Sequence, residues 1–570
     1  MSNDKNNNEK TEMSPIYEIS DNYVEKIAEL NPITATSLGI KGHETNLGDF
    51  TPEGNNKNAS LARNTLKALI TAPIQSEDDR RAKEVMTEDI ETELRLHKEQ
   101  EHYRSLNILH SPMHSIRMVF DHMPKNTVSE WENISERLSK IPKALSDYTS
   151  TLREGVKKNL VSTTRQSQAC AAQAATWAGS NGSTSFFANL LTEFKNADID
   201  SGKLQNALEV NISKSENAYG KFSEFLATEY TDRANPEDAV GDDRYQLWAR
   251  TYNGIDLDLI ETYEWGWDQL RWVEEEMNKT AKYIIPGGGV EEAKNLLESD
   301  PKRRVDGVEN FRSWMQNLQE KTIGELNGTH FDIPKPVTKI EALIAPEGGA
   351  LAMYYTRPSG DFSRPGRTWY PTGGKTSFPI WGEVSIAYHE GVPGHHFQIG
   401  TSVYLSETLS RYQRQLGGTS GYVEGWALYA ERLMGELGYL ENPDYYMGML
   451  RAQALRSVRV ILDIGMHLKL QIPQDSDFHP GQPWTPELGL AFIEKKSHFP
   501  KHFVASEIDR YLGLPGQAIS YKVGEKVWLE TRKSAKKKAG DKFNLKDWHT
   551  KALNLGGMGL SQMKRELLNI

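Results

Sequence analysis

Cysteine is almost absent from this chain, which has a single one, Cys170, among 570 residues. One thiol excludes an intramolecular disulfide, and a reducing compartment is compatible with this composition. Cys170 lies in the alanine-rich run 169–175. The run predicts that Cys170 packs as a small, buried apolar side chain.

Long hydrophobic runs and an excess of positive charge are also missing. No apolar stretch approaches the ~20 residues that cross a bilayer, so no membrane span is expected. The 67 lysines and arginines against 78 aspartates and glutamates give a net charge of −11, which argues against a nucleic-acid partner. The polar N-terminal residues lack the apolar core of a signal peptide, so the chain as it stands is expected to be cytoplasmic. Removal of a signal peptide from a precursor would instead make it periplasmic or secreted.

Helical periodicity dominates the rest of the chain. Residues 1–15 are polar and predict a disordered tail, whereas residues 16–345 carry apolar side chains at helical spacing over most of their length. Two short aromatic runs, 352–356 and 367–370, are separated by proline and glycine and predict a small antiparallel β element. Helical patterns then resume near residue 380. We expect a mainly α protein in which a helical lobe (16–345) and a catalytic region (346–570) form one integrated fold.

The strongest chemical signal lies at residues 388–398, which read Tyr-His-Glu-Gly-Val-Pro-Gly-His-His-Phe-Gln. His389 and Glu390 are adjacent, and His395 and His396 follow within two helical turns. Zinc hydrolases use such a set: neutral imidazoles hold the metal, and a neighbouring carboxylate takes a proton from the water that the metal polarises. We therefore expect one zinc ion per chain as the cofactor, with His389 as a ligand and Glu390 as the general base.

The spacing departs from the usual H-E-x-x-H form, in which two histidines four residues apart share one face of a helix. Pro393 occupies the position four residues after His389 and should interrupt the helix, because it lacks the N–H donor and clashes with the preceding turn. Gly394 can absorb the distortion, which brings His395 or His396 back toward the metal. We favour His395 as the second ligand and keep His396 as the alternative ligand or a pocket residue.

A third ligand is expected downstream, because catalytic zinc takes three protein ligands and keeps one position for water. The best candidate is Glu424 in the helical segment 421–431. Glu431, seven residues later, shares its face and would accept a hydrogen bond from a ligating imidazole. An amphipathic helix with two solvated glutamates is the alternative.

Two further segments carry polar groups that suit a hydrolase. Asp463 and His467 lie four residues apart in an apolar helical run, where the carboxylate would hold the imidazole ready to donate to a developing oxyanion. A purely structural network is the alternative. Near a Pro-Gly turn, Tyr511 and Tyr521 are candidate donors to a tetrahedral intermediate, with core packing as their alternative. Arg510 is a candidate clamp for a substrate carboxylate.

These segments resemble, in order, a bacterial family known as domain of unknown function 885, whose members are similar to gluzincin-type zinc metallopeptidases. The matching residues are Tyr355, Pro358-Ser359, Arg364 to Gly366, His389 to Gln398, Glu424 to Ala427, Tyr429, Glu431, Asp463 to His467, Arg510-Tyr511, Pro515 to Ala518 and Ser520 to Gly524. The resemblance implies a mainly α, two-lobed cleft fold with the small β element next to the metal-binding helix. It also implies zinc held by the histidine motif and Glu424, with Glu390 catalytic.

The expected function is a zinc metallopeptidase that hydrolyses short peptides as an oligopeptidase, dipeptidase or carboxypeptidase. Tyr355, Arg367 and Arg510 are the candidate substrate-binding residues, and Arg459 is a further candidate for holding a terminal carboxylate. Two alternatives stay open: hydrolysis of a non-peptide amide or ester, and a non-catalytic metal-containing protein that binds peptides. The sequence does not determine the oligomeric state.

Overall fold

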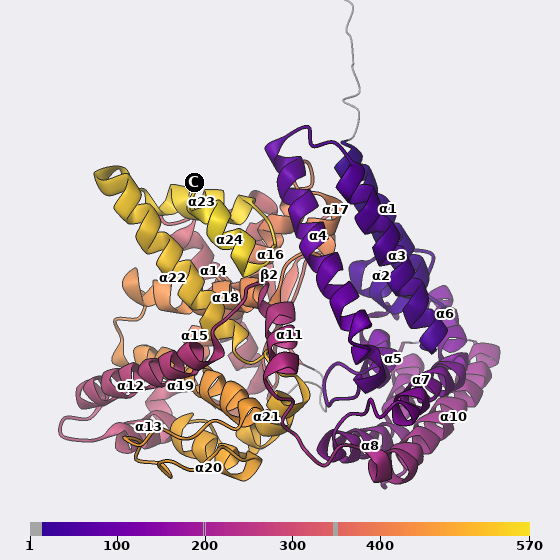
Figure 1. The fold of residues 1–570 in the computed structure, drawn as a ribbon. Helices are drawn as coiled ribbons and strands as arrows, with labels where there is room; N and C mark the ends of the chain where they lie inside the picture. Colours follow the sequence, from indigo (N-terminus) through magenta and orange to yellow (C-terminus); the bar gives the residue numbers. More distant parts are fainter. Residues whose placement is uncertain (1–13, 198, 200, 346–351) are drawn as a thin grey trace, which may run out of the picture.

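Helices make up most of the protein, and the few strands are short (Figure 1). The computed structural model describes residues 14–197, 199, 201–345 and 352–570. The predicted mainly α class is confirmed. The predicted N-terminal tail lies outside the described residues, except for Ser14 and Pro15, which begin the first helix: the Ser14 hydroxyl accepts a hydrogen bond from the backbone N–H of Ile16.

The helices of the first 230 residues stand on the right of Figure 1. They are α1 (Pro15–Leu30), α2 (Pro32–Leu38), α3 (Pro52–Thr71), α4 (Glu77–Lys98), α5 (Pro112–His122), α6 (Val128–Ser139), α7 (Ile141–Lys157), α8 (Thr164–Ala178), α9 (Phe186–Asn196) and α10 (Gly202–Phe225).

The remaining elements form the other part of the molecule, apart from α17, which lies beside α1 and α4. They are α11 (Asp242–Asn253), α12 (Leu259–Ile284), α13 (Val290–Ser299), β1 (Arg304–Asp306), α14 (Val308–Leu326), β2 (Ile340–Ile344), β3 (Tyr354–Thr356), β4 (Gly366–Tyr370), β5 (Ser377–Pro379), α15 (Glu383–Glu390), α16 (His395–Tyr404), α17 (Arg411–Gln415), α18 (Ser420–Glu436), α19 (Pro443–Leu468), α20 (Pro486–Lys496), α21 (Lys501–Gly513), α22 (Ser520–Ala539), α23 (Leu545–Asn554) and α24 (Leu560–Leu567).

Two large hydrophobic cores hold these helices together. One core is built from α5 to α10, and it buries Cys170 as an unpaired thiol, as the sequence predicted. The larger core unites α1, α3 and α4 with the helices from α11 onward. Helices on both sides of residue 345 share this larger core, so the boundary expected there does not coincide with the division between the cores.

The β element is larger than the sequence indicated. The predicted antiparallel pair is present as β3 and β4, with Tyr354 opposite Trp369. Strand β2 joins β4 in parallel on its other side, and a separate antiparallel ribbon pairs β1 with β5. Strands β1, β2 and β5 were not predicted from the sequence, because runs of three to five residues are too short to separate strand from helix by periodicity.

Close contact between α18 and α22 brings together segments about a hundred residues apart in sequence. The two helices approach at glycines: a Cβ atom on Gly524 would lie 2.1 Å from the backbone oxygen of Gly421, and one on Gly425 would lie 2.4 Å from the Gly524 Cα. This approach places the first turn of α22, which carries Tyr521, beside Glu424 on α18. Among the described residues, no helix has the length and apolarity that a membrane span requires.

We predict that Gly524→Ala lowers the free energy of unfolding by about 1–3 kcal/mol, because the added methyl group forces two backbones apart. Gly435→Ala, at a half-buried position near the end of α18, is the matched control. Its nearest neighbour would be 3.7 Å from the new Cβ, so it should instead raise the stability by up to about 1 kcal/mol through helix propensity. Thermal unfolding followed by circular dichroism measures both. An unchanged Tm for Gly524→Ala would contradict the close approach.

Candidate metal centre

The histidine motif sits at a break between two helices. Helix α15 ends at Glu390 and α16 begins at His395. The intervening residues are held by backbone hydrogen bonds, from Gly394 N–H to Tyr388 O at 2.9 Å and from His396 N–H to Gly391 O at 3.1 Å. The expected interruption of the helix at the Pro-Gly insertion is confirmed.

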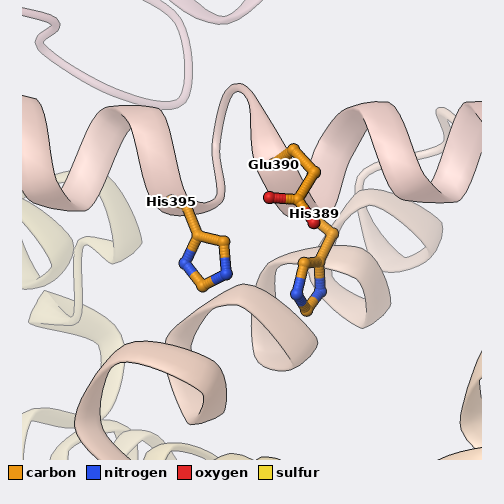
Figure 2. Close-up of side chains that lie close together, drawn as sticks. All are labelled: His389, Glu390 and His395. Carbon is orange, nitrogen blue, oxygen red and sulfur yellow. The ribbon is translucent and has the colours of Figure 1, made fainter. Parts of the chain in front are cut away.

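The break brings two imidazoles to the same side of the chain. Ligand atoms of His389, Glu390 and His395 all lie within 4.8 Å of one another, and all three residues are buried. Figure 2 shows the two imidazoles projecting from either side of the loop, with the Glu390 carboxylate above the space between them. The insertion thus compensates for the longer spacing between the histidines. His395, six residues after His389, occupies the place that the histidine four residues along would occupy on an uninterrupted helix.

Glu424 completes a set of ligands that fits a tetrahedral cation. Its Oε2 lies 3.4 Å from Nε2 of His389 and 3.4 Å from Nε2 of His395. Two ligand atoms about 2.0–2.1 Å from a tetrahedral zinc ion are about 3.3–3.4 Å apart. The same Oε2 is buried and has no hydrogen-bond donor among the described residues. A buried carboxylate oxygen without a donor is costly, and a cation would satisfy it.

The electrostatics of the site also favour positive charge. Burial alone would lower the pKa of His389, but the carboxylates of Glu424 and Glu431 raise it to about 10. Burial opposes ionisation of Glu424, yet the neighbouring imidazoles hold its pKa well below the usual range. Glu390 differs, because burial raises its pKa and the two imidazoles offset this only in part. A carboxyl group with a raised pKa suits a general base that must also release its proton.

A layer of hydrogen bonds fixes the orientation of His389. Its Nδ1–H donates to Oε1 of Glu431 at 2.7 Å, so the contact predicted for Glu431 is present. The other oxygen of Glu431 accepts from the Ser385 hydroxyl. The imidazole therefore presents Nε2 toward Glu424, and such a carboxylate–imidazole contact increases the basicity of a metal ligand.

His396 faces away from this cluster. Its Nε2–H donates to the backbone oxygen of Val337 at 2.7 Å, and its Nδ1 accepts from the Tyr355 hydroxyl at 3.0 Å. Burial lowers the pKa of His396 to about 4, so the ring is neutral. Both nitrogens are in use, which leaves His395 as the second candidate ligand. His396 instead ties the histidine motif to strand β3 and to the turn at Val337.

The candidate ligands open into a cavity of about 450 Å³. That volume lies in the range of pockets that enclose a small ligand. Of the residues selected from sequence, the cavity is lined by Tyr355, His389, Glu390, His395, Glu424, Arg459, Arg510 and Tyr521. The structure therefore brings together side chains from β3, α15, α16, α18, α19, α21 and α22.

Tyr521 lies beside the candidate metal ligands. Its ring stacks on that of His389, with centroids 6.4 Å apart and an angle of 20° between the planes. Arg510 lies beside it, with Nη2 3.5 Å from the Tyr521 hydroxyl, and binds Oε1 of Gln517 at 2.7 Å. Both side chains line the cavity, consistent with the roles predicted for them.

Tyr511 lies behind the cavity wall and does not line it. Its hydroxyl donates to Oε2 of Glu507 at 2.6 Å, and the same oxygen accepts from Arg459 at 2.8 Å. Burial opposes ionisation of Glu507, but Arg459 and Arg510 lower its pKa to about 2. Tyr511 therefore supports the carboxylate that holds these arginines, and its position does not support the predicted donation to a reaction intermediate.

Asp463 and His467 are also buried outside the cavity. His467 Nε2–H donates to the backbone oxygen of Tyr511 at 3.0 Å, and its Nδ1 accepts from the Val240 N–H at 3.3 Å. Burial raises the pKa of Asp463 to about 8, while Tyr245 and the Gly516 N–H donate to it. Both groups serve packing between α19, α11 and α21. The predicted oxyanion role of His467 is not supported by this position.

Arg367 does not reach the cavity either. It lies on β4, where its Nε donates to Oε2 of Glu341 on the adjacent strand at 2.7 Å. Two arginines that the sequence analysis did not select, Arg451 and Arg456, do line the cavity. With Arg459 they follow one face of α19, and three arginines among mainly apolar residues of one helix were the signal that could have found them.

We predict that His395→Ala lowers the affinity for Zn²⁺ by more than about 100-fold, since loss of even a residue that only orients a metal ligand costs 10–100-fold. His396→Ala is the matched control and should keep its affinity, because that ring bonds Val337 and Tyr355. Competition titration with a chelating dye measures both, and circular dichroism checks the fold. Equal loss of affinity in two folded variants would contradict the assignment of His395.

Comparisons with known proteins agree with this architecture. A crystal structure from Colwellia psychrerythraea, described as a "putative lipoprotein", superposes with a TM-score of 0.83 at 21% identity, over 98% of this chain and 99% of that one. A second, from Shewanella oneidensis and described as a "putative lipoprotein of unknown function", gives 0.72 at 17% identity over 97% and 99%. These likenesses establish a shared fold.

No curated protein matches the sequence. The profile of a bacterial family of unknown function, DUF885, matches residues 32–567, which is nearly the whole chain. The protein therefore belongs to the DUF885 family.

Proposed function

We propose that this protein is a zinc-dependent metallopeptidase that hydrolyses short peptides within the cavity. The observation that carries the proposal is the position of the Glu424 Oε2, which lies 3.4 Å from Nε2 of both His389 and His395 and has no hydrogen-bond donor among the described residues. Two imidazoles and a carboxylate form the ligand set that zinc takes in hydrolases. Glu390, in the same cluster, supplies the base.

The reaction follows from the placement of these groups. When bound by His389, His395 and Glu424, zinc would polarise a water molecule and the carbonyl of the scissile bond. Glu390 takes a proton from that water and passes it to the leaving amine. The Tyr521 hydroxyl, on the cavity wall beside the His389 ring, donates to the negative charge that develops on the carbonyl oxygen. Glu431 keeps the His389 imidazole in the orientation that ligation needs.

An edge of the small sheet supports a peptide as the substrate. Among the described residues, strand β3 pairs with β4 on one side only, and Tyr354 and Tyr355 on β3 line the cavity. An extended peptide can add to such an edge through main-chain hydrogen bonds. A non-peptide amide or ester would use the same chemistry without this contact.

We predict that Glu390→Gln lowers kcat by about 10²- to 10⁴-fold, because the amide cannot accept the proton. A mixed peptide library is incubated with wild type, Glu390→Gln and the exposed control Glu407→Gln, the cleavage products are identified by mass spectrometry, and zinc content is determined for all three. Cleavage by wild type and Glu407→Gln alone, with equal zinc, is the expected result.

Two other outcomes would overturn the proposal. Full turnover by a folded, zinc-loaded Glu390→Gln would refute the mechanism. Zinc in all three proteins and cleavage by none would indicate a non-peptide amide or ester as the substrate, or a binding protein.

We also propose that the protein acts outside the cytoplasm, in place of the location expected from the sequence. The support is that both structural neighbours are described as lipoproteins, a class of protein found in the cell envelope. Fractionation of the native cells should recover the protein from the periplasm, membrane or medium. Recovery from the cytoplasm would overturn the assignment.

A further inference from the structure

One buried cation in the cavity wall, Arg456, has no carboxylate partner in the part of the chain that the structure describes. Helix α19 lines the cavity with one face, which carries Arg451, Arg456 and Arg459. Arg456 is only 7% exposed, and its Nε has no hydrogen-bond acceptor among the described residues. Within the same part of the chain, no carboxylate oxygen lies within 4.0 Å of its guanidinium nitrogens.

The neighbouring arginines differ from Arg456 in this respect. Arg459 pairs with Glu507 at 2.8 Å, and Arg510 pairs with the same carboxylate at 3.2 Å. Arg451 lies 3.7 Å from Glu298 and stacks over the Trp381 ring with its Cζ 4.0 Å from the centroid. Arg456 is therefore the arginine of this wall that has no carboxylate partner among the described residues, and a buried charge without a partner is strongly unfavourable.

Arg456 lies close to the candidate catalytic centre. Its Cζ is 5.5 Å from the centroid of the Tyr521 ring, and that ring stacks on His389 at 6.4 Å. A ligand group bound by Arg456 would therefore sit next to the bond that is cleaved, with Tyr521 between it and the metal ligands.

We propose that Arg456 binds a carboxylate of the substrate, so that the site selects peptides carrying a carboxylate close to the scissile bond. This inference rests on the proposed peptidase function and restricts its substrates to peptides with such a carboxylate. A guanidinium binds a carboxylate through two parallel hydrogen bonds, which fixes position as well as charge. We take the terminal α-carboxylate, which every peptide substrate carries, as the source, which makes the enzyme an exopeptidase that releases C-terminal residues. An acidic side chain would offer the same group.

The test compares matched substrates that differ only in this carboxylate. An N-acetylated peptide is offered as the free acid and as the C-terminal amide. A third peptide is the same amide with its last residue replaced by glutamate. Wild type should cleave the free acid with a kcat/KM about 10- to 100-fold above that of the amide, as expected for hydrogen bonds to a charged group. Arg456→Gln should abolish this preference, and Arg456→Lys should restore part of it.

Arg271→Gln is the matched control, because Arg271 is an exposed arginine on α12 that pairs with Asp268. It should leave the preference unchanged. The fold of Arg456→Gln is checked by its zinc content and its Tm, and the Tm should not fall, because the substitution removes an unpaired buried charge. If Arg456→Gln does not fold, Arg456→Lys alone decides: an unchanged preference for the free acid would overturn the proposal.

A binding measurement separates this proposal from the peptidase function. Calorimetry measures N-acetyl-trialanine and its amide binding to wild type and to Arg456→Gln. Tighter binding of the acid by wild type alone, without hydrolysis of any peptide, would support the carboxylate site and overturn the peptidase. Hydrolysis of the acid and the amide at equal rates would support the peptidase function and overturn the carboxylate site. Selective cleavage of the glutamate-containing amide over the plain amide would assign the site to an acidic side chain.

Discussion

The candidate site depends on a half-buried carboxylate, one oxygen of which is buried between two imidazoles. Glu424 places one oxygen at equal distances from His389 and His395, and no donor among the described residues satisfies that oxygen. Such an arrangement is costly unless positive charge is added, because a buried charged group loses its hydration. The surrounding structure supplies what a cation needs: a fixed imidazole orientation through Glu431 and a base, Glu390, beside the ligands.

The fold brings this cluster together by close packing of helices from distant parts of the chain. The approach of α18 and α22 at Gly425 and Gly524 sets Tyr521 beside the ligands. On the opposite side, His396 joins α16 to the β element through Val337 and Tyr355. The rigidity of both contacts matters for chemistry, because catalytic groups must keep their positions within a fraction of an ångström.

Charge is distributed unevenly along the cavity, so its two ends differ in the ligand groups they favour. The carboxylates gather at the helix break, whereas the arginines lie along α19 and α21. Glu507 stabilises two of these arginines from behind the wall, with Tyr511 bonded to it. Arg456 has no such support among the described residues, and in the proposed function a substrate with its anionic group toward α19 would place its scissile bond toward the candidate ligands.

The sequence determined much of the chemistry because the informative groups are close together along the chain. The proline at 393 predicts the helix break, and a spacing of seven residues predicts that Glu424 and Glu431 share a face. These are local rules of helix geometry. Helical periodicity likewise predicted the mainly α class, and two aromatic runs separated by proline and glycine predicted the β3–β4 pair; the structure confirms both.

Only the tertiary structure decided between residues whose local sequence patterns are equivalent. His395 and His396 are adjacent, and contacts with Val337 and Tyr355 direct one ring away while the other faces Glu424. Tyr511 and Tyr521 differ in the same way, since one bonds a carboxylate behind the wall and the other reaches the cavity. Whether an arginine finds a carboxylate depends on partners 26 to 48 residues away, as for Arg367 and Arg459. Periodicity fixes which face of a helix a side chain occupies, but packing against distant segments decides what that face meets.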